Sequence, residues 1–512
     1  MRHRLPAPLS FTAPERSRWV AFAVLVLAVY LASRWALLYR LPYFIDEGTH
    51  ARFAYLGDHS LHDLFVSETI GKEPLLIWLA ILLMKLGISS LTAVRLSSVI
   101  SGALTIPIVW LLGARLAGNR TGAIAAAGCV VLPFFLVHDA IGIMEPLLTL
   151  LLMAALYLEI RLAQRPALVT GIALGLVLAA AYLTKESGEI ALALMPLSLV
   201  CFDWEAPDRR RRLIVWLGCV VIAVALTGAA DLLLRSSAYY ANFQATRASA
   251  FLYPVRSLTL ALAHPLRWWR VAWPVYRPAL LGYVGAPTLV AALLGIGLRW
   301  RRDWRSALLI TGWVVAMFGA AVLFPVSPYP RHILYLVPLL LIPAADAVVR
   351  AAGWVSERVP GRLAGPLVAV GVALLLAPVL RLDARVLAHP ASAPYPGADE
   401  VQYVTGPQAG SPWAAVAGAI RRGAGGRHVI VALDSADADV VKGLLRHSPR
   451  YTFVDGSTTA ARAAQFLLRD ELPFPDPAAN RLLADGGFQL IERLPRPDGG
   501  AVVSLYERAR AR

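Results

Sequence analysis

The chain has 512 residues, of which 58% are hydrophobic and only 16% are charged, and its mean hydropathy is +0.60. Soluble domains average roughly 45–50% apolar and about 25% charged residues, so a single soluble globular protein is excluded. The apolar excess lies in runs of about 18–23 residues between positions 19 and 381, the length that crosses a bilayer core. These runs predict an α-helical polytopic membrane protein, and residues 382–512, which contain no such run, predict one soluble domain.

The net charge of +16 does not indicate a nucleic-acid-binding protein. Lys and Arg fall mainly between the apolar runs, as the positive-inside rule predicts for cytoplasmic loops. The three cysteines, Cys129, Cys201 and Cys219, lie within or at the ends of apolar runs. The tail has none, which excludes a disulfide framework or a cysteine-ligated zinc site there. The first apolar run is too long for a signal-peptide core and lacks a clear cleavage site, so we expect a retained first span.

About eleven membrane spans are expected. Their ranges are 18–39, 92–114, 121–138, 146–162, 167–184, 187–202, 213–234, 278–298, 306–325, 332–350 and 363–381. The apolar run 74–88 is only about 15 residues long and is expected to lie along the interface or to dip into it. If that run crossed instead, the arginine cluster 209–212 would face outward. With eleven crossings, the short arginine-rich loops fall on the side of the N-terminus, which the rule makes cytoplasmic.

Four segments then lie on the outer side of the membrane. They are the loop 40–91, the turn 139–145, the loop 235–277 and the tail. The loop 235–277 breaks the charge rule with six arginines, at positions 235, 247, 256, 267, 270 and 277. Long loops follow the rule only weakly, and outward arginines at the interface would attract lipid phosphates.

The tail alternates helix-like and strand-like segments and predicts a small α/β domain. We divide the chain into a transmembrane domain at 1–381, a Pro/Ala-rich linker at 382–400 and the α/β domain at 401–512. Helices are expected at SPWAAVAGAIRR, DADVVKGLLRH and ARAAQFLLRDE, and strands at RHVIVALD, YTFVDG, FQLIERL and AVVSLYER. No glycine-rich phosphate loop joins a strand to a helix, so this domain is assigned no nucleotide site.

Acids and bases occur at five outward turns, which together could line one cavity at the outer leaflet. Two adjacent carboxylates, Asp46 and Glu47, follow the first span, where they are costly to desolvate. The other four turns supply Lys72 and Glu73, then Asp139 and Glu145, then Lys185, and finally Arg331, His332 and Tyr335. We predict that Asp46, Glu47 and Glu145 are catalytic and that the remaining residues bind substrate. Such a cavity suits sugar transfer from a polyprenyl-phosphate donor, whose lipid tail needs a membrane groove.

The chemistry of that reaction matches these residue types. Lys72, Lys185 and Arg331 could hold the donor phosphate. An aspartate near the anomeric carbon could take the proton of the acceptor hydroxyl. A carboxylate base opposite the leaving phosphate implies single displacement with inversion.

The same turns resemble motifs of the GT-C superfamily of integral-membrane glycosyltransferases, and most of all its branch of protein O-mannosyltransferases and lipid A aminoarabinose transferases. The resemblance spans about residues 20–350. The matching segments are LPYFIDEGTHARFA, ETIGKEPLLIWL, GIMEPLLTL, AYLTKESGEIAL and YPRHILYLVPLLLIPAA. The chain departs from the motifs at four positions: Glu73 replaces a usual proline, Glu145 an aspartate, Glu186 a glycine and His332 a tyrosine. The five matches occur in the order of the family's motifs, each at an outward turn.

The resemblance implies a GT-C-like catalytic domain with Asp46 as the catalytic base. It implies that Glu47 or Glu145 orients the acceptor or tunes Asp46, and that Lys72 and Arg331 contact the lipid phosphate. No cofactor is expected to be required. In some relatives a second-loop acid binds a divalent metal, which leaves that role open for Glu145.

The implied enzyme is mannosyltransferase-like and transfers a hexose or a pentose. The Ala/Arg/Gly/Pro-rich composition suggests a GC-rich bacterial genome, so we expect the donor to be an undecaprenyl- or decaprenyl-phosphate sugar. The other partners are membrane lipids and a glycan, lipid or protein acceptor, with no nucleic acid. We expect a multi-pass protein of the cytoplasmic (inner) membrane with a cytoplasmic N-terminus and an extracytoplasmic C-terminal domain.

Other interpretations stay open on the sequence alone. Charged residues at span ends also cap helices, form ion pairs or anchor a span at the headgroups, and His332 and Tyr335 can pack in an aromatic belt. A polytopic transporter or lipid flippase is the main alternative function, although the sequence shows neither the internal repeats nor the midplane charges that transporters often have. A non-enzymatic assembly protein that docks through its tail is the third.

Overall fold

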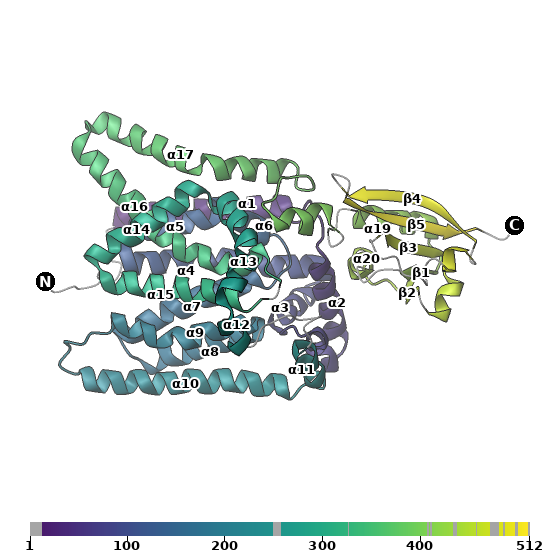
Figure 1. Cartoon of the computed structure of the whole chain (residues 1–512), viewed down its shortest axis with the longest axis horizontal. Helices are drawn as coiled ribbons and strands as arrows, with labels where there is room; N and C mark the ends of the chain where they lie inside the picture. The colour runs from purple at the N-terminus through teal and green to yellow at the C-terminus, as the bar shows by residue number, and fades with distance from the viewer. Residues whose placement is uncertain are drawn as a thin grey trace.

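The computed structural model describes residues 13–248, 258–325, 327–406, 409, 412–433, 438–456, 458–471, 481–484, 487–496 and 500–509. Figure 1 shows a bundle of long helices aligned with the longest axis and a five-stranded C-terminal sheet beyond one end of it. The chain is therefore a helical polytopic domain followed by a small α/β domain, as the sequence predicted.

Seven helices are long and apolar enough to cross a membrane within the part of the chain that the structure describes. They are α1 (Ala13–Leu37), α4 (Ser90–Ala117), α7 (Glu145–Gln164), α10 (Arg209–Arg235), α15 (Trp304–Leu323), the turn η5 (Pro330–Leu336) continued by α16 (Val337–Arg358), and α17 (Gly361–Ala388). Each contains most of one predicted span. Helix α17 also takes in the first residues of the segment 382–400 that the sequence assigned to a linker.

Three further predicted spans are helical but shorter or broken. The span 121–138 consists of α5 (Asn119–Val131) and α6 (Pro133–His138), which part where Pro133 lacks the amide hydrogen that would continue the helix. The span 167–184 is α8 (Leu168–Thr184), with 17 residues. The span 187–202 is a series of short turns, η2 (Glu186–Gly188), α9 (Glu189–Leu194) and η3 (Met195–Cys201).

The span predicted at 278–298 is wrong as a single straight helix. The helical segments Pro265–Val284 and Ala286–Arg302 meet at an angle of 95°. The break is at Gly285, whose φ of 84° is a conformation that glycine adopts at no steric cost. Most of the predicted span lies in α14 (Ala286–Arg302), which is preceded by α13 (Pro265–Ala279) and the π-helical turn η4 (Leu280–Val284). Counting the bent pair as one span raises the number of spans to eight.

The loop 40–91 forms three helices at the end of the bundle nearest the sheet domain (Figure 1). They are α2 (Ile45–His59), η1 (Leu61–Ile70) and α3 (Leu75–Met84). With 10 residues, α3 is too short to cross a bilayer, as predicted for the run 74–88. The loop 235–277 adds α11 (Tyr240–Ala248), α12 (Leu258–Ala263) and α13, while its Arg256 lies outside the described residues.

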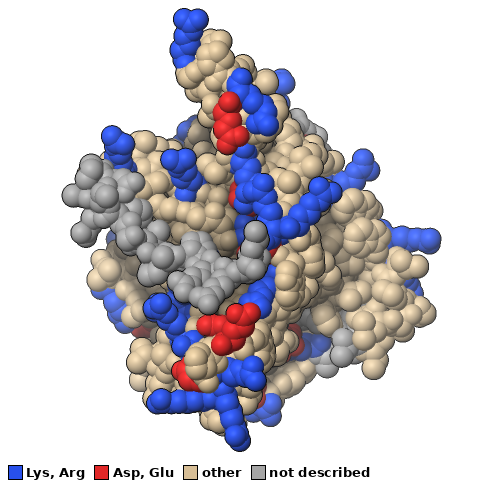
Figure 2. Space-filling model, turned by 90° about the vertical axis from the view of Figure 1, so that its left-hand side faces the viewer, with Lys and Arg blue, Asp and Glu red and all other residues tan. Residues whose placement is uncertain are grey.

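The opposite end of the bundle carries a rim of basic side chains with fewer acids among them (Figure 2). The helix ends found there carry the arginines that the sequence placed in short loops. They include Arg161 at the end of α7, Arg209 to Arg211 at the start of α10, Arg301 and Arg302 at the end of α14, and Arg358 at the end of α16, all exposed. The structure therefore gathers these charges at one end, away from the sheet domain.

The C-terminal sheet has the order β2-β1-β3-β5-β4. Strand β1 (Val429–Leu433) pairs in parallel with β2 (Tyr451–Asp455) and β3 (Phe466–Glu471), while β5 (Gly500–Arg508) pairs antiparallel with β3 and β4 (Phe488–Arg496). Helices α19 (Trp413–Ala424) and α20 (Ala438–Leu444) supply Trp413, Ile420 and Val441 to a core shared with the sheet.

The helix predicted at ARAAQFLLRDE is wrong in its second half. The segment forms a short turn, η7 (Thr459–Ala463), and then strand β3. Phe466 and Leu468 face the core with α19, whereas Leu467 packs in a second cluster. This two-residue alternation is that of a strand covered on both faces, and pairing with β1 and β5 outweighs the local preference for a helix.

The α/β domain rests on helix α2. Arg52 lies 3.4 Å from Asp439 of α20, and the ring of His447 stacks on Tyr55 at 4.0 Å. A Cβ atom on Gly48 would come within 2.6 Å of the Val440 backbone nitrogen, so the two helices touch closely. The C-terminal domain thus packs directly on the helix that carries Asp46.

Candidate active site

Asp46 lies at the start of α2, between two cations. Its Oδ1 is 3.2 Å from Lys72 Nζ, and its Oδ2 accepts a hydrogen bond of 3.1 Å from Arg331 Nη2. Burial acts to raise the pKa of Asp46, but Lys72 and Arg331 outweigh it and hold the pKa well below its usual range. The side chain keeps 26% of its surface exposed, so this ionised carboxylate remains accessible.

Glu145 supplies a second carboxylate to the same place. It begins α7, where a negative charge is favoured by the helix dipole. Its Oε1 lies 2.7 Å from Lys185 Nζ and 3.6 Å from Arg331 Nε. Arg331 thus bridges Asp46 and Glu145, and the residues from five separate turns form one cluster of two acids and three cations.

Local backbone geometry explains how Lys72 reaches this cluster. Helix η1 ends at Gly71 in the left-handed conformation, with φ of 73°, which turns the chain back toward α2. Lys72 Nζ also lies 3.3 Å from His50 Nε2, while His50 Nδ1 is 2.9 Å from the Gly142 carbonyl. Because a carbonyl oxygen only accepts hydrogen bonds, His50 Nδ1 is the donor to Gly142, and His50 Nε2 accepts the hydrogen bond from Lys72. Burial, followed by Lys72, lowers the pKa of His50 to about 4, so it is neutral here.

Glu47 was predicted to be catalytic, and the structure turns it away from this cluster. It is fully buried, and Arg95 binds its two oxygens at 2.7 and 2.9 Å. The carboxylate also accepts the amide hydrogens of Phe44 and Gly142. With both oxygens held in this way, Glu47 fixes the start of α2 and is not available to a substrate. Asp46 and Glu47 are adjacent in sequence but point to different partners.

Asp139 was predicted to bind substrate, and the structure places it in another buried group. Its Oδ2 accepts a hydrogen bond of 3.0 Å from the Tyr30 hydroxyl and lies 3.9 Å from Arg34 Nη2. Asp139 therefore compensates the arginine of the first span, because an uncompensated charge at that depth is costly.

Glu73 belongs to a neighbouring ion group rather than to the Asp46 cluster. Its Oε1 lies 2.6 Å from Arg247 Nη2 and accepts the Glu186 amide hydrogen at 2.8 Å. Burial raises the pKa of Glu73, although Arg247 opposes the shift. Arg247, from α11, was not singled out as a site residue, and the sequence signal for it was its place among the six arginines of the loop 235–277.

His332 and Tyr335 lie beside the cluster. His332 is in electrostatic contact with Lys185, Arg331 and Glu145, and its Nδ1 receives the Tyr329 amide hydrogen at 3.4 Å. Tyr335 is buried and interacts with Glu145. Both predicted residues are therefore neighbours of Glu145.

The donor set does not favour a divalent cation at Glu145. The carboxylate already faces two cations, Lys185 and Arg331, which would repel a metal ion. In the residues that the structure describes, no group of three or more His, Cys, Asp or Glu side chains is arranged to hold one.

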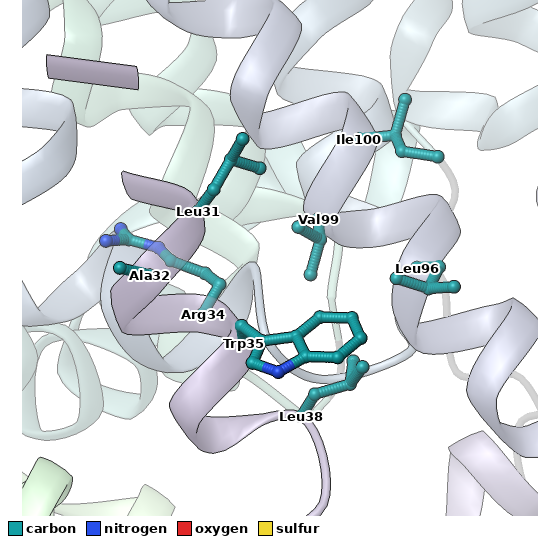
Figure 3. A pocket seen from close by; sticks show the side chains of 8 residues that line it. All are labelled: Leu31, Ala32, Arg34, Trp35, Leu38, Leu96, Val99 and Ile100. Atoms are coloured by element: carbon teal, nitrogen blue, oxygen red, sulfur yellow. The ribbon is translucent and has the colours of Figure 1, made fainter. Parts of the chain in front are cut away.

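An apolar groove of about 420 Å³ lies between α1 and α4. Its lining comprises Leu31, Ala32, Arg34, Trp35, Leu38, Leu96, Val99 and Ile100. In Figure 3 the guanidinium of Arg34 points away from the α4 side chains. None of the lining residues belongs to the Asp46 cluster.

Two comparisons with known proteins bear on this arrangement. A family model described as dolichyl-phosphate-mannose-protein mannosyltransferase matches residues 71–230, which include Lys72, Glu145 and Lys185. The solved structure of ArnT from Cupriavidus metallidurans in the apo state is 18% identical, with a TM-score of 0.62 over 96% of this chain and 98% of that one. The chain has the GT-C fold of membrane glycosyltransferases.

Further GT-C structures agree. ArnT from the same organism bound to undecaprenyl phosphate is 19% identical, with a TM-score of 0.60 and coverage of 96% of this chain and 98% of that chain. The archaeal oligosaccharyltransferase AglB from Archaeoglobus fulgidus, in complex with an inhibitory peptide and a dolichol-phosphate, is 12% identical, with a TM-score of 0.56 over 98% of this chain and 75% of that chain. No curated protein sequence matches the chain significantly.

Proposed function

We propose that this GT-C protein transfers a sugar from a polyprenyl-phosphate donor to an acceptor at the outer face of the cytoplasmic membrane. The observation that carries the proposal is the cluster of Asp46 and Glu145 with Lys72, Lys185 and Arg331 at the end of the bundle nearest the α/β domain. One cluster thus combines an accessible ionised carboxylate with cations suited to a phosphate.

In the proposed reaction, Lys72 and Arg331 bind the donor phosphate and Asp46 acts as the base. The acceptor oxygen bonds to the anomeric carbon, the bond from that carbon to the phosphate oxygen breaks, and the acceptor proton goes to Asp46. Polyprenyl phosphate leaves with the electron pair, and the configuration at the anomeric carbon inverts.

The donor would also activate the base. In the free protein Lys72 and Arg331 hold the pKa of Asp46 low, which makes it a weak base. An anionic phosphate bound to the same cations would reduce their effect on Asp46 and raise its pKa. Glu145 would keep Lys185 and Arg331 in place.

The orientation follows from the arginine rim at the opposite end of the bundle. Under the positive-inside rule this rim is cytoplasmic, so the site and the C-terminal domain lie outside. The transferred sugar is a hexose or a pentose, and the match of residues 71–230 to the mannosyltransferase model favours the hexose. The acceptor class, whether lipid, glycan or protein, is left open by this argument.

Asp46→Asn tests the proposal. The purified variant should lose about 10²–10⁴-fold in the rate of transfer from a radiolabelled polyprenyl-phosphate sugar to cell-envelope acceptors, because an amide cannot take the acceptor proton. Asp58→Asn is the matched control, since Asp58 lies in the same helix and pairs with His59 and Lys85 near the surface. Asp46→Asn protein that transfers sugar as fast as the parent would rule out this mechanism.

A further inference from the structure

The segment that connects α17 to the α/β domain, residues 389–405, packs into the membrane domain. Asp399 is fully buried and accepts a hydrogen bond of 2.7 Å from the Tyr283 hydroxyl. The same carboxylate lies 3.3 Å from His138 Nε2. This connecting segment is therefore fixed to α6 and η4, although the sequence assigned most of it to a linker.

Tyr403 brings the connecting segment to the border of the charged cluster. It lies in the π-helical turn η6 (Val401–Thr405) and is 3% exposed. Its ring packs edge-on against Phe44 at 5.3 Å, and the Arg331 guanidinium carbon lies 5.1 Å from the centre of the same Phe44 ring. The Tyr403 hydroxyl, like Arg331 Nη1, is buried without a hydrogen-bond partner among the described residues, and it interacts electrostatically with Arg331 and Glu145. The tyrosine and the arginine thus share one aromatic support.

Arg331 needs such support because its ion pairs occupy only part of the guanidinium. Nη2 and Nε face Asp46 and Glu145, whereas Nη1 is buried without a hydrogen-bond partner among the described residues. A long side chain loses rotamer entropy when it is held in one geometry. Groups packed around the arginine restrict its side chain before the donor binds, so that less rotamer entropy is lost on binding.

We propose that Tyr403 is a positioning residue that holds the Arg331 guanidinium between Asp46 and Glu145. It acts through Arg331 and touches no reacting atom. The proposal rests on the proposed function insofar as Arg331 binds the donor phosphate. It follows that the site is completed by residues beyond the last span.

Tyr403→Phe tests this inference, because it keeps the ring and removes only the hydroxyl. We expect the KM for the polyprenyl-phosphate sugar to rise about tenfold with kcat nearly unchanged, the pattern for a lost contribution to donor binding. Tyr395→Phe is the matched control, since its hydroxyl bonds the Pro390 carbonyl within the same segment, and it should keep the parent KM. In an Arg331→Lys background, Tyr403→Phe should add nothing further.

A parent-like KM for Tyr403→Phe, or a full tenfold effect in the Arg331→Lys background, overturns the inference. A cryo-electron microscopy structure of the Tyr403→Phe protein in nanodiscs provides a readout that does not need activity. We expect Arg331 to move beyond ion-pair distance of Asp46 or Glu145, and an unmoved Arg331 contradicts the inference. If the parent transfers no sugar, the proposed function fails, while this structure still decides the role of Tyr403.

Discussion

Adjacent carboxylates at the start of α2 have opposite environments. Asp46 is partly exposed and faces Lys72 and Arg331, which belong to other turns. Glu47 is buried against Arg95, and its oxygens are fully occupied. One residue is suited to chemistry because the other fixes the helix that presents it.

Glu47→Gln should therefore damage stability rather than chemistry. The amide leaves the Arg95 cation buried without its counter-ion, and breaking a buried pair costs about 3–5 kcal/mol. Thermal unfolding of the purified protein in detergent measures the effect. Asp46→Asn, which leaves the Glu47–Arg95 pair intact and removes a partly exposed charge, should lower the unfolding temperature less than Glu47→Gln does. Equal unfolding temperatures for Glu47→Gln and the parent would contradict the structural role.

The sequence motifs identified the residues that meet in the cluster better than they identified the roles of their neighbours. Each of the five residues comes from a motif at a turn, and the structure brings together Asp46, Lys72, Glu145, Lys185 and Arg331. The direction of a side chain within a turn is set by tertiary partners, which is why the sequence did not reveal that Glu47 faces Arg95 and that Asp139 faces Tyr30 and Arg34. Arg247 and Tyr403 could not be found this way, because they come from distant segments without a motif.

At the scale of elements, α2 is held between the bundle and helix α20. His447, which follows α20, stacks on Tyr55 and lies 3.3 Å from the Ser90 hydroxyl. The position of α2, and with it that of Asp46, thus depends on the C-terminal domain. No pattern in the sequence predicted this contact, since its residues are separated by about 390 positions and joined only by packing.

Docking of α20 on α2 should weaken in acid. Burial is the main cause that lowers the pKa of His447 to about 4, against an ordinary value of about 6.5. At a pH between about 4 and 6.5, the docked state binds fewer protons than the undocked state. Docking is therefore strongest above about pH 6.5 and is lost progressively as the pH falls toward 4. Nearby charges are those of Arg52, His59, Asp439 and Lys442.

Hydrogen exchange measures this effect. After correction for intrinsic rates, amides of α20 should exchange faster at pH 5 than at pH 7 in the parent. His447→Gln, which cannot titrate, should remove most of that difference. The same pH dependence in both proteins would assign it to other groups.

At the scale of the whole molecule, charge and hydropathy predicted most of the architecture. The long apolar runs became helices, and the arginine loops gathered at one end because consecutive helices alternate in direction. The bend at Gly285 and strand β3 were not predicted, since both depend on partners distant in sequence. A glycine within an apolar run does not reveal whether the helix continues through it.

The membrane orientation can be tested by cysteine labelling in spheroplasts. The natural residues Cys129, Cys201 and Cys219 are buried and should react little. A membrane-impermeant maleimide should label Arg422→Cys, whose parent side chain is 73% exposed on the α/β domain, in intact spheroplasts. Arg210→Cys, in the arginine rim, should react only after permeabilisation. Labelling of Arg210→Cys in intact spheroplasts would reverse the proposed orientation.

The buried Arg34 has a consequence for biosynthesis. Only 22% of the most apolar 18-residue stretch of α1 is buried. Arg34, in the last turn of the helix, donates to the Val130 carbonyl, 96 residues later in the chain. At about 5–20 residues per second, the ribosome delivers that partner roughly 5–20 s after the arginine. Until then the first span carries a charge that disfavours release into lipid. We expect the translocon to retain α1 until α5 and α6 arrive. The first span to be synthesised would then not be the first to be released into the lipid bilayer.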